Sequence, residues 1–186
     1  MYTEKILQRF RIENSKALSP PCDVAKSQEG DPSMVDVPYS EAVGCLQYLA
    51  VTIRPNIAFA VVFASRALCK PTKDDWKHVE RIYIYLRGTS NVGLLYKSHV
   101  QTEFSVSSDA DHASDEKTRR STSGMVSMNS CSAITWRSRL QHSVAISSFE
   151  AEYVAASEAS NQLVWLKLLF KELFEYDGSP FLYVDN

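Results

Sequence analysis

Three acidic residues stand at positions that solubility alone explains poorly. Asp109 directly follows residues 104–108, whose alternation predicts a β-strand, and Asp185 follows residues 181–184 in the same way. Ligands gather at the carboxyl ends of strands in mixed α/β sheets, so both carboxylates are candidates for one shared site. The third acid, Glu152, lies in a segment whose apolar residues recur with helical spacing.

Helical geometry separates Glu152 from its neighbour Glu150. Successive helical residues turn by about 100°, so these two side chains point about 200° apart and cannot both face one site. Glu152 shares its side with Ala155 and Ala159, small residues expected to press against a sheet, whereas Glu150 falls on another side. A carboxylate on the packed side of a helix is costly unless a cation or a donor pairs with it, which favours Glu152 as the third acid.

The oxygen set formed by Asp109, Glu152 and Asp185 suits Mg²⁺ or Mn²⁺ and not zinc. In phosphoryl chemistry two such ions, roughly 3.5 to 4 Å apart, activate a water on one side and stabilise the leaving oxygen on the other. Acids also cap turns and helix starts in many proteins. From the residues alone, a purely structural role for the three acids therefore stays open.

Other common chemistries find no support in the sequence. The four histidines show no metal-ligand spacing, and the chain has neither a Gly-x-Ser-x-Gly elbow nor a glycine-rich phosphate loop. The four cysteines are too widely spaced for a Cys-x-x-Cys knuckle, and we expect them to be reduced. Hydrolase triads and nucleotide binding are therefore disfavoured.

Charge is distributed unevenly along the chain, although the formal net charge is only −2. Residues 117–139 contain five basic and no acidic residues, whereas residues 148–186 contain seven acids and two lysines. The basic segment supplies four candidates for contact with a phosphate backbone, Arg119, Arg120, Arg137 and Arg139. A second basic set, spaced by four residues along a predicted helix, consists of Lys73, Lys77 and Arg81. Two solvated surfaces of opposite sign would give the same pattern, so both interpretations stay open.

The periodicity changes once along the chain, from helical to alternating. Helices are predicted over 1–12, 39–53, 57–69 and 72–87, and the last begins with a capping box, Thr72 to Asp75. Strands are predicted over 93–96, 104–108, 124–129, 133–136 and 181–184, with a long helix from Ser147 that Asn161 interrupts. The expected class is therefore α/β, or mixed α+β, with a helical segment before a mixed sheet and its flanking helices.

Neither a membrane span nor an export signal is expected. The longest apolar run, 57–64, is far short of the roughly 20 residues that a spanning helix needs. The first residues carry charges in place of the apolar stretch of a secretory signal. We therefore expect an intracellular protein, cytoplasmic or nuclear.

Several short sequence motifs resemble the ribonuclease H region of copia-type retrotransposon polyproteins. In chain order they are Ser108-Asp109-Ala110-Asp111, Thr118-Arg119-Arg120-Ser121-Thr122-Ser123-Gly124, Ile134-Thr135-Trp136, and Ser147-Ser148 with Glu150-Ala151-Glu152-Tyr153. Upstream, residues 39–48, 54–58, 65–66 and 85–89 are similar to the segment that joins the reverse transcriptase of that family to its nuclease. The resemblance covers nearly the whole chain.

The resemblance implies three regions and a reaction. Residues 1–36 would be a short helix and connector at the end of the reverse transcriptase, 37–90 a helical thumb-like or connection segment, and 91–186 a ribonuclease H-like domain with a mixed five-stranded sheet. Such a domain cuts the RNA strand of an RNA–DNA hybrid with a divalent metal, and the remainder of the polyprotein would be a partner. By position, Asp109 matches the first catalytic aspartate, Glu152 the glutamate of the first helix, and Asp185 the aspartate that ends the fourth strand.

The sequence departs from the family pattern in two ways. His112 stands where the family usually has Trp, and Ser114 where it usually has Gly. The chain also ends one residue after Asp185, so the family's next helix, last strand and fourth acidic position have no counterpart. Two hypotheses follow: a truncated domain with an ancestral two-metal nuclease reaction, or a catalytically inactive remnant that binds nucleic acid or another protein.

Overall fold

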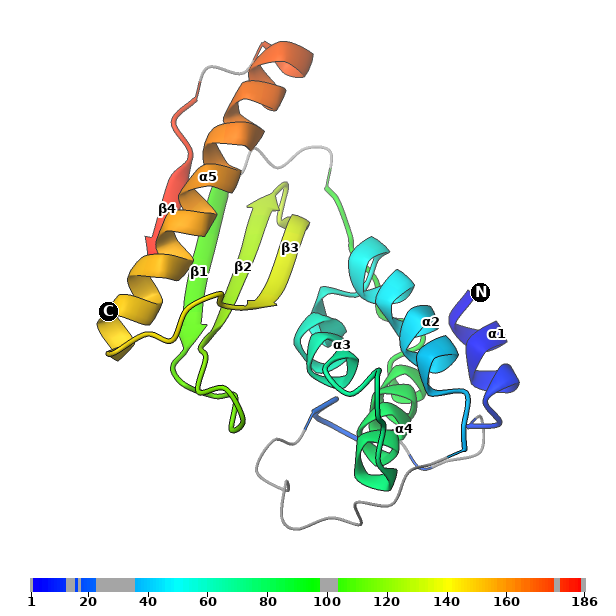
Figure 1. Cartoon of the computed structure of the whole chain (residues 1–186). Helices are drawn as coiled ribbons and strands as arrows, with labels where there is room; N and C mark the ends of the chain where they lie inside the picture. Colours follow the sequence, from blue (N-terminus) through cyan, green and yellow to red (C-terminus); the bar gives the residue numbers. More distant parts are fainter. Residues whose placement is uncertain are drawn as a thin grey trace. The chain divides into compact units, whose positions relative to one another are not determined.

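Two units make up the chain, Met1–Gly93 and Leu94–Asn186 (Figure 1). The computed structural model describes residues 2–12, 16, 18–22, 36–97, 104–175 and 178–184. Within these residues the chain forms helices and a four-stranded mixed sheet, which confirms the expected mixed α/β class. We describe each unit by itself.

The first unit is helical. Its elements are α1 (Tyr2–Arg9), α2 (Tyr39–Thr52), the short 3₁₀ helix η2 (Pro55–Ile57), α3 (Ala58–Ser65) and α4 (Lys73–Gly88). The predicted capping box of α4 is present, since the Asp75 N–H donates to Thr72 Oγ1 at 3.3 Å and the Thr72 N–H to Asp75 Oδ2 at 2.8 Å. The apolar faces of all four α-helices meet in one buried cluster.

Two buried tyrosines tie these helices together through backbone carbonyls. Tyr39 Oη donates to Ala64 O at 2.8 Å, and Tyr83 Oη donates to Ala42 O at 2.9 Å. Burial raises the pKa of both phenols, because the interior disfavours the phenolate. Both hydroxyls therefore stay protonated and keep their hydrogen bonds wherever the unit is folded at ordinary pH.

The second unit holds the sheet. Its elements are β1 (Ser105–Asp111), β2 (Thr122–Asn129), β3 (Ser132–Leu140), α5 (Ser148–Phe174) and β4 (Phe181–Val184). The strand order is β3-β2-β1-β4, with β1/β2 and β2/β3 antiparallel and β4 parallel to β1. A parallel neighbour needs a crossover connection, and α5 provides it while lying across one face of the sheet (Figure 1).

Strand β1 presents two different faces. Val106 packs with Ala159 and Leu166 of α5, and Ser108 is also buried, so the even-numbered residues face the helix. Side chains alternate along a strand, so Ser107 and Asp109 lie on the face opposite α5. Asp109 is exposed there.

Two expectations about these elements were wrong. Residues 93–96 form no strand: Leu95 and Tyr96 are 70% and 53% exposed, and Tyr96 Oη, not a backbone ladder, reaches Ala133 O at 2.7 Å. The described sheet accordingly has four strands, where the resemblance implied five. Asn161 does not interrupt α5, because it lies on the exposed side of the helix, where a polar residue costs little.

None of the described helices combines the length and the apolarity that crossing a membrane requires.

Candidate active site

Asp109 lies near the C-terminal end of β1, directly opposite Gly124 of β2. Neighbouring side chains do not crowd it on that side. A Cβ built on Gly124 would meet no atom closer than the Asp109 carbonyl oxygen, at 3.9 Å. The Asp109 carboxylate therefore stands on an open part of the sheet face that α5 does not cover.

Glu152 reaches the same end of β1 from the helix. Its Oε1 accepts the Ala110 backbone N–H at 3.1 Å. The pairing of β4 with β1 ends at Val184 and Ser108 in the described chain, so β4 does not take this N–H. The Glu152 carboxylate is thereby held beside the residue that follows Asp109.

The neighbouring Glu150 has a different task. Its Oε2 accepts the Ile146 N–H at 2.7 Å, while its own N–H donates to Ser147 Oγ at 3.1 Å. The bond to Ser147 caps one of the unpaired N–H groups in the first turn of α5, and the bond from Ile146 ties the residue before the cap to that turn. The structure thus turns Glu152 toward β1 and uses Glu150 at the helix start.

Asp185 lies outside the described residues. The residue before it, Val184, pairs with Ser108, which is the residue before Asp109. Across the described parts of the chain, no group of three or more histidine, cysteine, aspartate or glutamate side chains is arranged to hold a metal ion. Of the three expected carboxylates, the described chain places two at the same end of β1, with Asp109 on the open face of the sheet and Glu152 reaching Ala110 from the α5 side.

Asp111 and His112 extend the same end of the sheet. Strand β1 runs to Asp111, so alternation puts this exposed carboxylate on the face of Asp109. His112 Nε2 lies 3.3 Å from Ala145 O, in the loop that leads into α5. Asp111 is therefore a second acid on the open face, and His112 links this end of β1 to that loop.

The arginines expected to contact nucleic acid divide into two groups. Arg119 and Arg120 lie in the loop that joins β1 to β2, beyond the end of β1 where Asp109 stands. Arg137 pairs with Glu158 of α5 at 2.8 Å, and Arg139 Nη2 contacts His142 Nε2. The register puts Arg137 and Arg139 on the α5 side of the sheet, opposite the face of Asp109. The loop arginines therefore lie beyond the Asp109 end of β1. Arg139 is in register with Ser123 and Ala110 at that same end, but like Arg137 it lies on the α5 side of the sheet.

The basic set of α4 belongs to the helical unit. Lys77 Nζ pairs with Asp74 Oδ1 at 2.7 Å, and Arg81 Nε donates to Pro20 O at 3.0 Å. Lys73, at the first turn, is exposed. The Lys77 and Arg81 side chains are thus already engaged within their own unit.

A glutamine beside this site was missed by the sequence analysis. Gln141 is 2% exposed and follows β3 directly, with its side chain against the first turn of α5. No spacing rule marks it, because its partners come from two other parts of the chain, the start of β2 and the first turn of α5. A polar residue between an alternating strand and a helix start normally indicates an exposed loop.

Comparison with known proteins gives long matches to transposon polyproteins. The chain is 38% identical over 196 aligned residues to a retrovirus-related Pol polyprotein from transposon TNT 1-94 of Nicotiana tabacum, and 33% identical over 189 residues to that from transposon RE2 of Arabidopsis thaliana. Each match covers 100% of this chain. The chain spans only 14% and 13% of the length of these two relatives.

A shorter relative is matched over nearly its whole length. It is the secreted RxLR effector protein 161 of Plasmopara viticola, 41% identical over 133 residues, which are 72% of this chain and 94% of that protein. No family model matches the chain. No solved structure matches it significantly.

Proposed function

This chain is homologous to part of the retrovirus-related Pol polyproteins of copia-type transposons, and from that premise we propose that its second unit is a ribonuclease H-like domain. The proposed reaction is hydrolysis of the RNA strand of an RNA–DNA hybrid with Mg²⁺ or Mn²⁺. The proposed metal-holding carboxylates are Asp109, Glu152 and Asp185. The remainder of a polyprotein is the proposed partner in the full-length context.

One observation carries this proposal. The Glu152 carboxylate accepts the N–H of Ala110, next to Asp109, although the two acids are 43 positions apart in the sequence and come from a helix and a strand. The Ala110 N–H gives this half-buried carboxylate one hydrogen-bond partner, and a bound cation would compensate its charge further. The parallel register of β1 and β4 supports Asp185 as the third carboxylate. Val184 pairs with Ser108, and these two residues directly precede Asp185 and Asp109 in the sequence.

The donor chemistry fits hard divalent cations. Both described carboxylates offer oxygen, the ligand that Mg²⁺ prefers. When bound, such cations would activate a water and neutralise charge on the leaving oxygen. Asp109 would contribute an exposed carboxylate, and Glu152 one whose orientation the Ala110 N–H fixes. Arg119 and Arg120 add sequence-independent, salt-dependent attraction for the backbone.

The test is cleavage of a labelled RNA–DNA hybrid in Mg²⁺ by the parent chain and by Asp109→Asn, Glu152→Gln and Asp185→Asn. Loss of one of these carboxylates is expected to slow cleavage by about 100-fold or more, because each contributes to several kcal/mol of charge stabilisation. Glu150→Gln is the matched control, since it makes the same change two residues away in the helix cap and keeps most of the activity. Cleavage by Asp109→Asn at the parent rate would refute the proposal.

A non-catalytic role is the second candidate. It is favoured by the relative from Plasmopara viticola, 94% of which aligns with this chain, so a protein of similar extent exists without the rest of a polyprotein. In this role the unit binds nucleic acid or another protein and cuts nothing. Hybrid binding by both the parent and Asp109→Asn, with no cleavage by either, supports it. A binding constant that falls steeply with salt assigns the contact to the phosphate backbone.

A further inference from the structure

Gln141 is a buried amide with three hydrogen bonds at the junction of β2, β3 and α5. Its backbone N–H donates to Ser121 O at 2.8 Å. Its side-chain Nε2 donates to Ser123 Oγ and to Ala151 O, each at 2.9 Å. One side-chain nitrogen thus joins the start of β2 to the first turn of α5.

The partners of Gln141 are the direct neighbours of the candidate site. Ser123 is the ladder partner of Ala110 in β1, and Ala110 donates to Glu152. Ala151 directly precedes Glu152 in the helix. The contacts therefore form a closed circuit from Gln141 through Ala151 and Glu152 to Ala110, and back through Ser123.

We infer that Gln141 is a positioning residue, which sets the first turn of α5 against β2 so that the Glu152 carboxylate meets the end of β1. This inference rests on the proposed function of Glu152. Gln141 itself touches no group expected to react. It acts by fixing the position of α5 along β2, and the rotation of α5 about its axis, through the bond to Ala151, the residue before Glu152.

The chemistry at this position requires an amide. Ala151 O can only accept, so the nitrogen and not the oxygen of the Gln141 side chain must face it. Gln141 Oε1 has no hydrogen-bond partner among the described residues. A buried polar atom without a partner costs free energy, so methionine or leucine would serve better if the position only filled space. The two hydrogen bonds that Nε2 donates therefore explain why a glutamine occupies this position.

The test compares Gln141→Met with Thr135→Val by two readouts. Gln141→Met keeps the volume and removes both donors, whereas Thr135→Val removes a different side-chain hydrogen bond of the same sheet, from Thr135 Oγ1 to Ser127 Oγ. The first readout is hydrogen exchange of the Ala110 amide by NMR, which needs no catalysis. The second is kcat and KM for Mg²⁺-dependent hybrid cleavage.

Gln141→Met is expected to speed Ala110 exchange about tenfold and to lower kcat about tenfold with KM unchanged, the range typical when a supporting hydrogen bond of a site is lost. Thr135→Val is expected to leave both within about twofold on the same argument. Equal effects of the two variants, or unchanged Ala110 exchange in Gln141→Met, would overturn the inference. If Gln141→Met does not fold, Ser123→Ala takes its place, because it removes one partner and leaves the bond to Ala151. A parent chain that cleaves nothing refutes the proposed function, while the exchange readout still decides the role of Gln141.

Discussion

The two units bury different kinds of side chain. Among the described residues of Met1–Gly93, seventeen apolar residues are buried in one core, with members from α1, α2, α3 and α4. The buried apolar residues described in the second unit are eight: Phe104, Val106, Ala133, Ala145, Ala151, Ala155, Ala159 and Leu166. Four of these are alanines in α5 or in the loop before it, and each buries little area. Apolar burial therefore stabilises the helical unit far more than the sheet unit.

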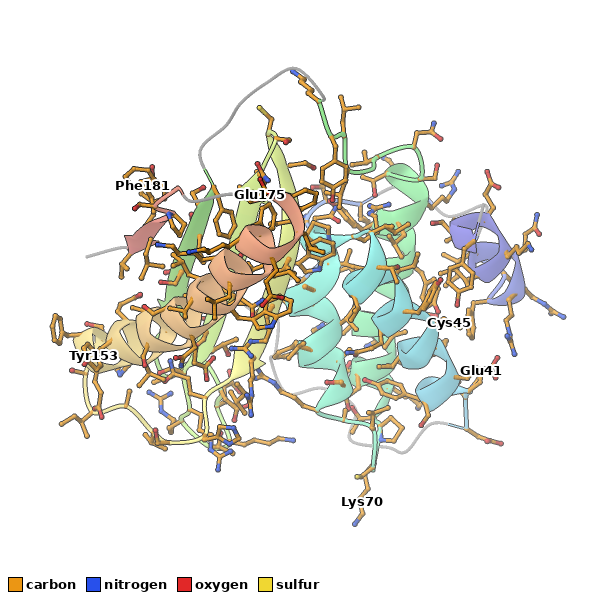
Figure 2. The ribbon with its side chains drawn as sticks, turned by 90° about the horizontal axis from the view of Figure 1, so that it is seen from above. Glu41, Cys45, Lys70, Tyr153, Glu175 and Phe181 are labelled. Carbon is orange, nitrogen blue, oxygen red and sulfur yellow. The ribbon has the colours of Figure 1, made fainter. Side chains whose placement is uncertain are left out.

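Polar burial shows the opposite distribution. Nine described residues are buried and polar, and seven belong to the second unit: Ser108, Ser121, Thr122, Ser123, Ser127, Ser132 and Gln141. Hydrogen bonds contribute little net stability each, but they are directional. At the same time α5 leaves Trp165 and Leu168 more than half exposed, and Figure 2 shows Tyr153 and Glu175 near its two ends. The sheet unit therefore buries less apolar surface and more hydrogen-bonding side chains than the helical unit. These directional hydrogen bonds orient polar groups, and the candidate site lies in the same unit.

The strongest test of this comparison is to open a cavity in the helical core. Leu46 is 0% exposed in α2. Leu46→Ala is expected to lower the free energy of unfolding of this unit by about 2–5 kcal/mol, through lost transfer energy and the cavity left behind. Amide exchange measured as a function of urea concentration, with α4 and β2 as separate reporters, gives the stability of each unit on its own.

Val51→Ala is the control for that substitution. Val51 lies in the same helix and is 66% exposed, so its truncation is expected to change stability by less than about 0.5 kcal/mol. Equal losses for Leu46→Ala and Val51→Ala would contradict a core built on apolar burial. A loss in β2 as large as that in α4 would show that the two units unfold together.

Alkaline pH is expected to destabilise the helical unit next most strongly. Burial raises the pKa of Tyr39 and Tyr83, so above about pH 10 the unfolded chain loses these protons while the folded unit keeps them. The unfolded state then binds fewer protons, and stability falls with pH by about 1.4 kcal/mol per pH unit for each tyrosine. Below pH 10 the contribution is constant. Urea midpoints of α4 between pH 9 and pH 11 measure the slope, and Tyr83→Phe is expected to remove about half of it.

Local rules predicted much of this fold. The starts of α4 and α5 followed from Thr72 with Asp75 and from Ser147, because capping is settled within four residues. The segment 93–96 was wrongly predicted to be a strand, since a short apolar run does not reveal whether a neighbouring strand pairs with it. Pairing is a tertiary property, and in the order β3-β2-β1-β4 the neighbours β1 and β4 pair residues that are 76 positions apart, such as Ser105 and Phe181.

The candidate site also has features that local rules predicted and features that depend on tertiary structure. Which glutamate turns to the sheet followed from helical periodicity, since the apolar stripe of α5 is local and Glu152 lies within it. The circuit around Gln141 was beyond such reasoning, because its partners Ser121, Ser123 and Ala151 meet only after the sheet and α5 have assembled. The ion pair of Arg137 with Glu158 was missed for the same reason, so the basic segment looked more uniform than it is.

The smallest expected effect concerns the buried hydroxyls of the sheet. Ser127 is 0% exposed and accepts from Thr135 Oγ1 at 3.1 Å. Ser127→Ala alone is expected to cost about 1 kcal/mol, because it leaves the Thr135 hydroxyl without its acceptor. Joined with Thr135→Val, the loss is expected to shrink to about zero, since replacing both partners by apolar groups of similar shape is nearly neutral. A double-mutant cycle on the urea unfolding of β2 measures the coupling. Losses that simply add would show that these hydroxyls act independently, and a large loss in the double variant would mean that polar burial stabilises this unit instead of only orienting it.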